Sequence, residues 1–266
     1  MSESVTVTID EHVAVVTLNR PNKSNAVTME MFDALGDAGE KLAAERLIRA
    51  VVLQGAGANF CAGIDISIIS QDDAVIDASS MSPGDQSPAN RFQRAAYVWR
   101  ELPVPVICAI TGVAYGAGLQ IALGADLRYA AADARLSIME TKWGLIPDLA
   151  ISTTLRDILP ADRVKELAWS GRVVDANEAL SLGLITELHD DPRAAAMQTA
   201  REICAKSPDA VRAMKKLVHS AWRMTEAEAL ALEAELQLEV LRGENQREAV
   251  LANVQQRKPD FSDPQH

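Results

Sequence analysis

The chain has 266 residues, of which 48% are hydrophobic and 24% charged, and its formal net charge at pH 7 is −11. This length suffices for one large hydrophobic core or for a main domain with a helical appendix, and the composition is that of an ordinary globular protein. The acidic balance argues against a nucleic-acid partner, no run approaches the roughly 18 apolar residues of a membrane span, and the first residues lack a basic secretion signal, so we expect a cytoplasmic protein without a membrane partner.

The N-terminal part of the chain is predicted to form two strands, a helix and a third strand. Residues 5–9 and 13–18 alternate or run apolar on either side of the turn-like Asp10-Glu11, which indicates a β-hairpin. Residues 27–50 carry apolar side chains near helical spacing, and residues 50–53 return to a buried strand. This alternation predicts an α/β fold in which helices cover a sheet.

Two glycine-rich turns follow. Residues 55–66 form a turn after the apolar strand, and residues 114–120 form a second turn that opens the apolar helix 120–125. A turn that opens a helix leaves backbone N–H groups without intrahelical partners, and these groups can hold negative charge that develops in a reaction. Each turn alone is more typical of close packing. If they face each other, they outline an oxyanion hole.

The segment between the turns, residues 70–90, is polar and rich in Ser and Asp. Such a composition cannot offset its ordering entropy by burying apolar surface, so it predicts a mobile loop. Two interpretations stay open: a loop that borders a site, or a plain surface insertion.

A short strand is predicted at residues 127–130, and the chain beyond Ser152 is predicted to be mostly helical. Asp175 with Glu178, and Thr225 with Glu228, have the spacing of helix N-terminal capping boxes. Apolar residues at helical spacing predict a buried stripe formed by Leu232, Leu236 and Val240. We therefore expect a core in residues 1–200 and a helical region in residues 201–266.

Two carboxylates follow the second turn and are candidates for moving protons. Glu140 lies twenty residues after Gln120, and Asp148 lies eight residues after Glu140. The plainer interpretations are a surface carboxylate at a strand end for Glu140, and for Asp148 an N-cap of a helix that starts near Ala150.

The cysteines and histidines indicate no metal centre. Neither set has metal-ligand spacing, the odd cysteine count argues against a disulfide framework, and the scattered histidines make a histidine-based triad improbable. These residues are Cys61, Cys108, Cys204, His12, His189, His219 and His266.

Short blocks in a fixed order cover nearly the whole chain. They include Leu18-Asn-Arg-Pro21 with Asn25-Ala26, Phe60-Cys-Ala-Gly-Ile-Asp65, Pro105-Val-Ile-Cys-Ala-Ile-Thr-Gly112 leading into Gly116-Ala-Gly118, Gly144-Leu-Ile-Pro147, Ser170-Gly-Arg172 and Arg257-Lys-Pro259. In this order they resemble the crotonase family, the enoyl-CoA hydratase and isomerase superfamily. The resemblance implies a crotonase-type spiral of repeated strand-strand-helix units that binds an acyl-CoA thioester. It also implies a C-terminal α-helical region that makes a homotrimer or a dimer of trimers.

The resemblance further implies that the backbone N–H groups of Ala62 and Ala117 form the oxyanion hole. Relatives usually have glycine where this chain has Ala117, so the hole survives if that position does not need a positive φ. The other substrate-contacting positions that it implies are Lys23, Ala26, Gly63, Ile64, Asp65, Ile66, Tyr115, Gly116, Gln120 and Trp143. Because the net charge repels anionic CoA, its phosphates need a local basic cluster, for which the candidates are Lys23, Lys215, Lys216, Arg257 and Lys258.

The choice of reaction depends on Gln120. Hydratases of the family hold one water between two glutamates, but here the first position is Gln120, and an amide does not exchange a proton at neutral pH. Dienoyl-CoA isomerases of the family pair a glutamate and an aspartate that match Glu140 and Asp148, although they have an aspartate in place of Gln120. We therefore expect a double-bond isomerase without a metal or a cofactor beyond the CoA that its substrate carries. The alternatives are a hydratase in which Gln120 positions water beside Glu140, and an acyl-CoA-binding protein without catalysis.

Overall fold

Two sheets organise the chain. Residues 3–69, 80–84 and 87–264 are described in the computed structural model. A six-stranded sheet has the order β1-β2-β3-β4-β6-β9, and a three-stranded sheet has the order β5-β7-β8. The strands are β1 (Val5–Asp10), β2 (Val13–Leu18), β3 (Ala50–Gly55), β4 (Val106–Ile110), β5 (Val113–Tyr115), β6 (Leu127–Ala130), β7 (Arg135–Ser137), β8 (Val174–Asp175) and β9 (Glu187–Leu188).

The larger sheet begins with the predicted hairpin and continues in parallel. Strands β1 and β2 pair antiparallel, with Val5 opposite Leu18, and the pairs β2–β3, β3–β4, β4–β6 and β6–β9 are all parallel. Parallel neighbours need crossover connections, and here helices supply several of them. The prediction of a sheet covered by helices is confirmed.

The helices occupy most of the remaining chain. The α-helices are α1 (Met29–Ala44), α2 (Ile66–Ile69), α3 (Arg94–Glu101), α4 (Ala117–Leu123), α5 (Ile151–Thr154), α6 (Ala161–Ser170), α7 (Ala176–Leu182), α8 (Pro192–Cys204), α9 (Pro208–Ala221), α10 (Glu226–Arg242) and α11 (Glu244–Val254). Short 3₁₀ helices are η1 (Pro21–Lys23), η3 (Glu140–Trp143) and η4 (Leu155–Asp157).

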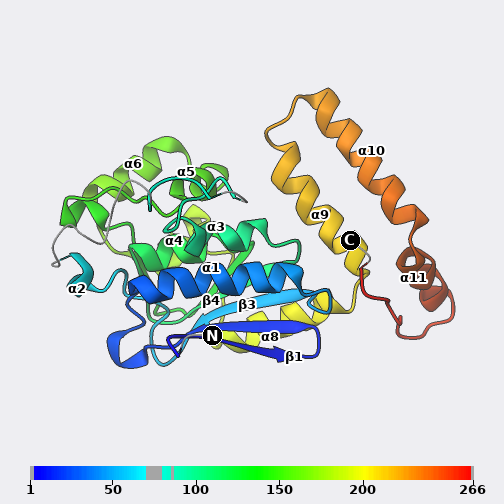
Figure 1. Cartoon of the computed structure of the whole chain (residues 1–266), viewed down its shortest axis with the longest axis horizontal. Coiled ribbons are helices and arrows are strands. Elements are labelled where there is room, and N and C mark those ends of the chain that lie inside the picture. The colour runs from blue at the N-terminus through cyan, green and yellow to red at the C-terminus, as the bar shows by residue number, and fades with distance from the viewer. Residues whose placement is uncertain (1–2, 70–79, 85–86, 265–266) are drawn as a thin grey trace.

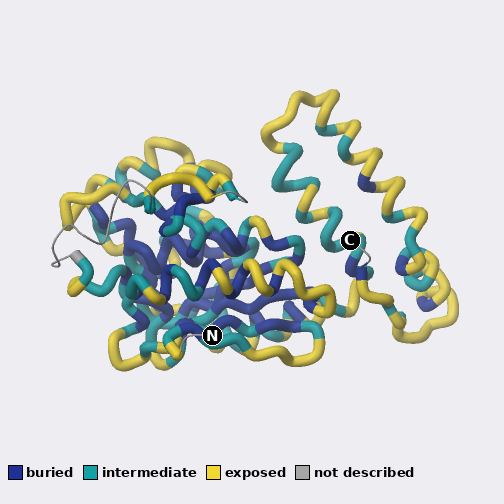
Figure 2. The backbone as a smooth tube through the Cα atoms, in the orientation of Figure 1, coloured by how far each residue is buried: buried dark blue, intermediate teal, exposed yellow. Residues whose placement is uncertain are grey.

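The sheet is buried on both faces. Because successive side chains of a strand point to opposite faces, Val51 and Leu53 of β3 join the core beneath α1, α3 and α4, while Val52 joins a second cluster against α8. Figure 2 shows this dark, buried centre between the helical layers. Trp99 of α3 is fully buried in the first cluster, so it belongs to the core.

The C-terminal helices α9, α10 and α11 stand apart from the core, and much of α10 is exposed (Figures 1 and 2). Both predicted caps are present, with Asp175 at α7 and a complete Thr225–Glu228 capping box at α10. Only Leu236 of the expected stripe is fully buried in the single chain. The expected boundary after residue 200 falls within α8, which packs on the sheet.

Helix α9 is fastened to the core by Lys215. The Lys215 ammonium donates to the carbonyl oxygens of Trp99 (3.1 Å) and Val104 (2.9 Å) and to the carboxylate of Asp126 (2.7 Å). These three bonds use all of its donors, so Lys215 does not serve a phosphate.

Part of the polar segment predicted as a mobile loop, residues 70–79 and 85–86, lies outside the described residues. Among the residues that are described, no helix combines the length and the apolar character needed to cross a membrane.

Candidate active site

The two glycine-rich turns are interlocked. Cys61 pairs with Ala114 in a β-bridge, and the Tyr115 N–H donates to the Cys61 carbonyl at 3.0 Å. A Cβ atom at Gly118 would lie 2.5 Å from the same carbonyl oxygen, so only glycine fits there. The Cys61 thiol, buried between the turns, lies 3.1 Å from the Asn25 carbonyl, and burial raises its pKa to about 12. The turns therefore face each other, which is the condition for an oxyanion hole between them.

The expected donor in the first turn is wrong. The N–H group of Ala62 donates to the Ser24 carbonyl at 2.9 Å, so it is not available to a substrate. In the neighbouring bridge, Val27 bonds to Gly63 and Asp65 on either side of Ile64, which turns the Ile64 N–H away from Val27. No acceptor for the Ile64 N–H is found among the described residues, and this group replaces Ala62 as the candidate donor.

Ala117 meets the condition for a donor in the second turn. It is the first residue of α4, where an N–H has no intrahelical acceptor, and its φ is not positive. The unusual backbone conformation falls on Gly116 instead, with φ 50° and ψ −119°. Alanine at position 117 is therefore compatible with an oxyanion hole.

Glu140 is buried beside Gln120, so the interpretation of a surface carboxylate is wrong. The exposed fraction is 7% for Glu140 and 1% for Gln120. The Gln120 Nε2 donates to Glu140 Oε1 at 2.6 Å, and the Leu149 N–H donates to Gln120 Oε1 at 2.8 Å. The second oxygen of Glu140, Oε2, is buried without a partner among the described residues.

The surroundings of Glu140 favour its neutral form. Burial raises the pKa of the Glu140 carboxyl above its ordinary value, and the negative charge of Asp148 raises it further, against the lowering effect of the Gln120 amide. Perturbation of this kind is typical of proton-transferring carboxyl groups.

Asp148 does not cap a helix, so that interpretation is also wrong. Helix α5 begins at Ile151, its N-cap position is Ala150 in a left-handed conformation, and no side chain caps it. Burial raises the pKa of the Asp148 carboxyl. The two acids are thus both partly or fully buried, and close enough for the charge of Asp148 to act on Glu140.

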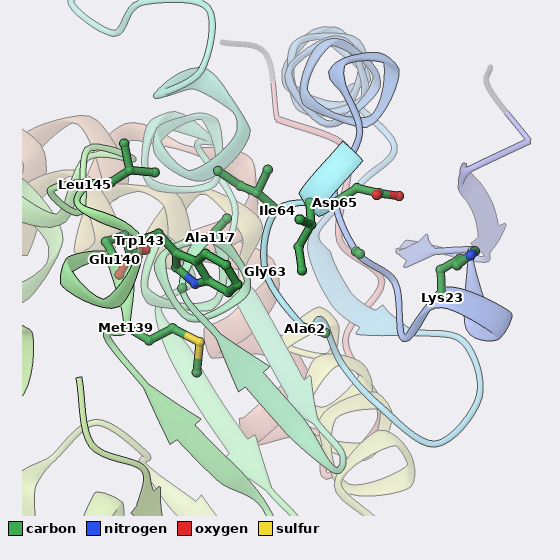
Figure 3. Close-up of a pocket in the computed structure, with 13 residues that line it drawn as sticks. Lys23, Ala62, Gly63, Ile64, Asp65, Ala117, Met139, Glu140, Trp143 and Leu145 are labelled. Atoms are coloured by element: carbon green, nitrogen blue, oxygen red, sulfur yellow. The ribbon is translucent and has the colours of Figure 1, made fainter. Parts of the chain in front are cut away.

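A cavity of about 270 Å³ lies between the turns and η3 (Figure 3). Its lining residues are Lys23, Ala26, Ala62, Gly63, Ile64, Asp65, Ile66, Gly116, Ala117, Met139, Glu140, Trp143 and Leu145. Of the predicted residues, Tyr115, Gln120 and Asp148 are not among them. Met139 and Leu145 were not predicted. Met139 directly precedes Glu140 and Leu145 directly follows the turn at Gly144, so their positions in the sequence could have indicated that they line the cavity.

The ends of the cavity differ in chemistry. Lys23 lies at one end, and Trp143, Glu140 and Met139 lie at the other (Figure 3). Asp65 supports the first turn, because it accepts from Ser67 and Arg20, which lower its pKa. The polar end therefore suits an anionic group, and the apolar end holds the acid.

Comparisons with known proteins agree on one family. The family model described as enoyl-CoA hydratase/isomerase matches residues 8–264. The 1,2-epoxyphenylacetyl-CoA isomerase of Escherichia coli (strain K12) is 33% identical over 98% of this chain and 99% of its own length. The mitochondrial Delta(3,5)-Delta(2,4)-dienoyl-CoA isomerase of Homo sapiens is 34% identical over 80% of this chain and 67% of its own. A crystal structure of enoyl-CoA hydratase from Bacillus anthracis gives a TM-score of 0.88 at 26% identity, covering 97% of this chain and 98% of that one.

Proposed function

We propose that this chain, which belongs to the enoyl-CoA hydratase/isomerase family, is an isomerase that moves a double bond in an acyl-CoA thioester. The observation that carries the proposal is the buried carboxyl group of Glu140 together with the half-buried carboxyl group of Asp148, whose pKa values are both raised by burial. Two acids with separate positions can remove a proton at one carbon and return one at another.

In this proposal the thioester oxygen accepts hydrogen bonds from the N–H groups of Ile64 and Ala117. These bonds stabilise the enolate that forms when the Glu140 carboxylate takes a proton from carbon. Asp148, which starts in its protonated form, then gives a proton to a more distant carbon, so the double bond moves and the mass of the substrate is conserved. Before the next turnover Glu140 releases its proton to solvent and Asp148 takes one up, which restores both groups. The CoA enters as part of the substrate, with Lys23 near its phosphates, and Glu140 and Asp148 make both proton transfers to and from carbon.

In the hydratase alternative, Gln120 positions the water molecule that adds to the substrate. The amide of Gln120 is bonded to Glu140 on one side and to Leu149 on the other. These contacts favour a role in holding Glu140 over a role in holding water. The burial of Glu140 also argues against the other alternative, an acyl-CoA-binding protein without catalysis. A buried carboxyl group whose Oε2 atom lacks a partner among the described residues costs stability, which a protein without catalysis has no reason to retain.

Mass spectrometry of the products decides between these functions. The purified protein is incubated with 2-enoyl-, 3-enoyl- and 3,5-dienoyl-CoA substrates. Isomerisation predicts a product of unchanged mass with a different retention time or ultraviolet spectrum. A gain of one water across the panel would establish the hydratase instead, and no product from any substrate would favour the binder.

The oxyanion hole can be tested at Ala117 without breaking α4. Proline is tolerated at the first position of a helix, where its missing N–H costs no intrahelical bond. We expect Ala117→Pro to lower kcat/KM by about 10²- to 10³-fold, because one donor is lost and the ring fills its place. Ala117→Gly keeps the N–H and is the control. If the folded proline variant keeps activity within a few-fold of native, the N–H of Ala117 is not a donor of the oxyanion hole.

We also propose that the protein is a homotrimer or a dimer of trimers. The support is the number of large apolar side chains that are exposed on and beside the C-terminal helices of the single chain. The exposed residues are Met214, Trp222, Met224, Leu230, Leu238, Leu241, Val250, Leu251 and Val254. The three free thiols agree with a reducing, cytoplasmic location, which is part of the same proposal.

Light scattering tests the assembly. The expected mass is three or six times the 28.7 kDa of one chain, and Leu238→Asp is expected to shift it toward the single chain. A native mass of 28.7 kDa at micromolar concentration would refute the trimer.

A further inference from the structure

We propose that Gln120 is a positioning residue whose side-chain amide fixes Glu140 relative to the segment that carries Asp148. The inference rests on the proposed isomerase, because the groups that Gln120 positions are the two acids of that reaction. Gln120 itself does not line the cavity. It makes the two proton transfers depend on one buried amide.

The chemistry of its two neighbours allows the amide only one orientation. An ionised Glu140 can only accept, so the Nε2 group faces it at 2.6 Å, and the Leu149 N–H can only donate, so the Oε1 atom faces it at 2.8 Å. The surrounding residues of α4 are buried and apolar, which leaves the amide no other partner among the described residues. Gln120 therefore bridges two segments in a fixed sense.

The bridge holds one end of the loop between η3 and α5. At the start of that loop, the N–H groups of Gly144 and Leu145 bond to carbonyls of η3. In its middle, Ile146 is 76% exposed. At its end, directly after Asp148, the Leu149 N–H bonds to the Gln120 side chain. This last bond connects the Asp148 end of the loop to Gln120, and Gln120 in turn bonds to Glu140.

The bridge also makes the two oxygens of Glu140 unequal. Because Oε1 accepts from the amide, Oε2 is the oxygen without a partner among the described residues. The donated hydrogen bond favours the carboxylate form, which is the form that removes a proton, in an environment where burial favours the neutral form. A carboxylate at position 120 would still accept from Leu149 but would have no proton to donate to an ionised Glu140.

Two variants separate the two bonds. Gln120→Met removes both at similar side-chain length, whereas Gln120→Glu keeps the acceptor for Leu149 and loses the donor to Glu140. Leu119→Met, at the adjacent buried position of α4, is the control for repacking. The measurements are kcat and KM against pH, deuterium exchange at the two ends of the unsaturated system by NMR, and amide hydrogen exchange of Leu149.

For Gln120→Met we expect a KM near native, a kcat lowered about tenfold or more, and Leu149 exchange about tenfold faster. Exchange at the distal carbon should fall more than exchange next to the carbonyl, because the Asp148 segment is released. For Gln120→Glu we expect native Leu149 protection, and in both variants the rise of kcat with pH should move to higher pH.

A folded Gln120→Met variant with native Leu149 protection, pH profile and exchange ratio would overturn the inference. If the native protein isomerises no substrate but Leu149 protection is lost in Gln120→Met and kept in Gln120→Glu, the isomerase proposal fails and the bridge stands. The amide readout therefore distinguishes the two failures.

Discussion

Replacing Glu140 with glutamine is expected to lower kcat for double-bond migration by about 10²- to 10⁴-fold while leaving the Kd for acyl-CoA nearly unchanged. Glutamine has the same shape, and its carbonyl can still accept the hydrogen bond from Gln120, so the cavity keeps its contacts. What is lost is the oxygen that carries the proton. Stopped-flow assays of turnover and calorimetric titration of a bound acyl-CoA measure the two quantities separately.

The same substitution is expected to raise thermal stability at neutral pH. Burial raises the pKa of Glu140 above its ordinary value of 4.5, so ionisation in the folded protein costs stability as the pH rises from that value through the raised one. Below pH 4.5 the carboxyl is neutral in both states and the penalty is absent. Calorimetry should therefore show a Tm advantage of the variant at pH 7 to 8 that shrinks toward pH 4.

The control for this prediction is Glu233→Gln, a change of the same kind at an exposed position of α10. It should alter neither kcat nor the pH dependence of Tm. Native turnover in the Glu140 variant on every accepted substrate would show that this carboxyl is structural.

Asp148→Asn is expected to abolish the return of the distal proton and to lower isomerisation by about 10²-fold or more. Exchange of the proton next to the carbonyl should persist, because Glu140 and the two backbone donors are untouched. Asparagine preserves the size of the side chain, and Asp148 does not cap α5, so the substitution removes no helix-capping bond. NMR in deuterated water follows both positions in one experiment.

A matched control is Asp133→Asn, at an exposed position between β6 and β7. Unchanged distal exchange in the Asp148 variant would remove this residue from the mechanism. Glu140 would then be the one acid left with a proposed role in proton transfer, and a one-acid hydratase would become the better account.

Local patterns were sufficient to predict some elements of the fold, but not the central strand β4 or helix α3. The hairpin, α1 and β6 each carry their own periodicity, and the capping box at Thr225 is a contact between neighbours in sequence. Strands β7, β8 and β9 were not predicted. They contain two or three residues and exist only through pairing with distant segments, which a local pattern does not reveal.

The errors at the site have a similar cause. The sequence locates a turn at Ala62 but not the Ser24 carbonyl that uses its N–H, because the chain must fold before these residues meet. Aspartate is a common N-cap residue, so the sequence suggested that Asp148 caps a helix. In the structure the N-cap position of α5 is Ala150, in a left-handed conformation that alanine seldom adopts. The sequence indicated only that Gln120 replaces a catalytic acid of the family's hydratases. The structure adds its two partners, Glu140 and Leu149, which are distant in sequence.

The thiol of Cys61 gives the site a reporter of its own motion. It is enclosed where the two turns meet, and a thiol reagent attacks only the thiolate, which is scarce when the pKa is about 12. Modification of Cys61 therefore requires the turns to separate and water to enter between them. The rate of that modification measures local opening of the proposed oxyanion hole, and a bound acyl-CoA that contacts both turns should slow it.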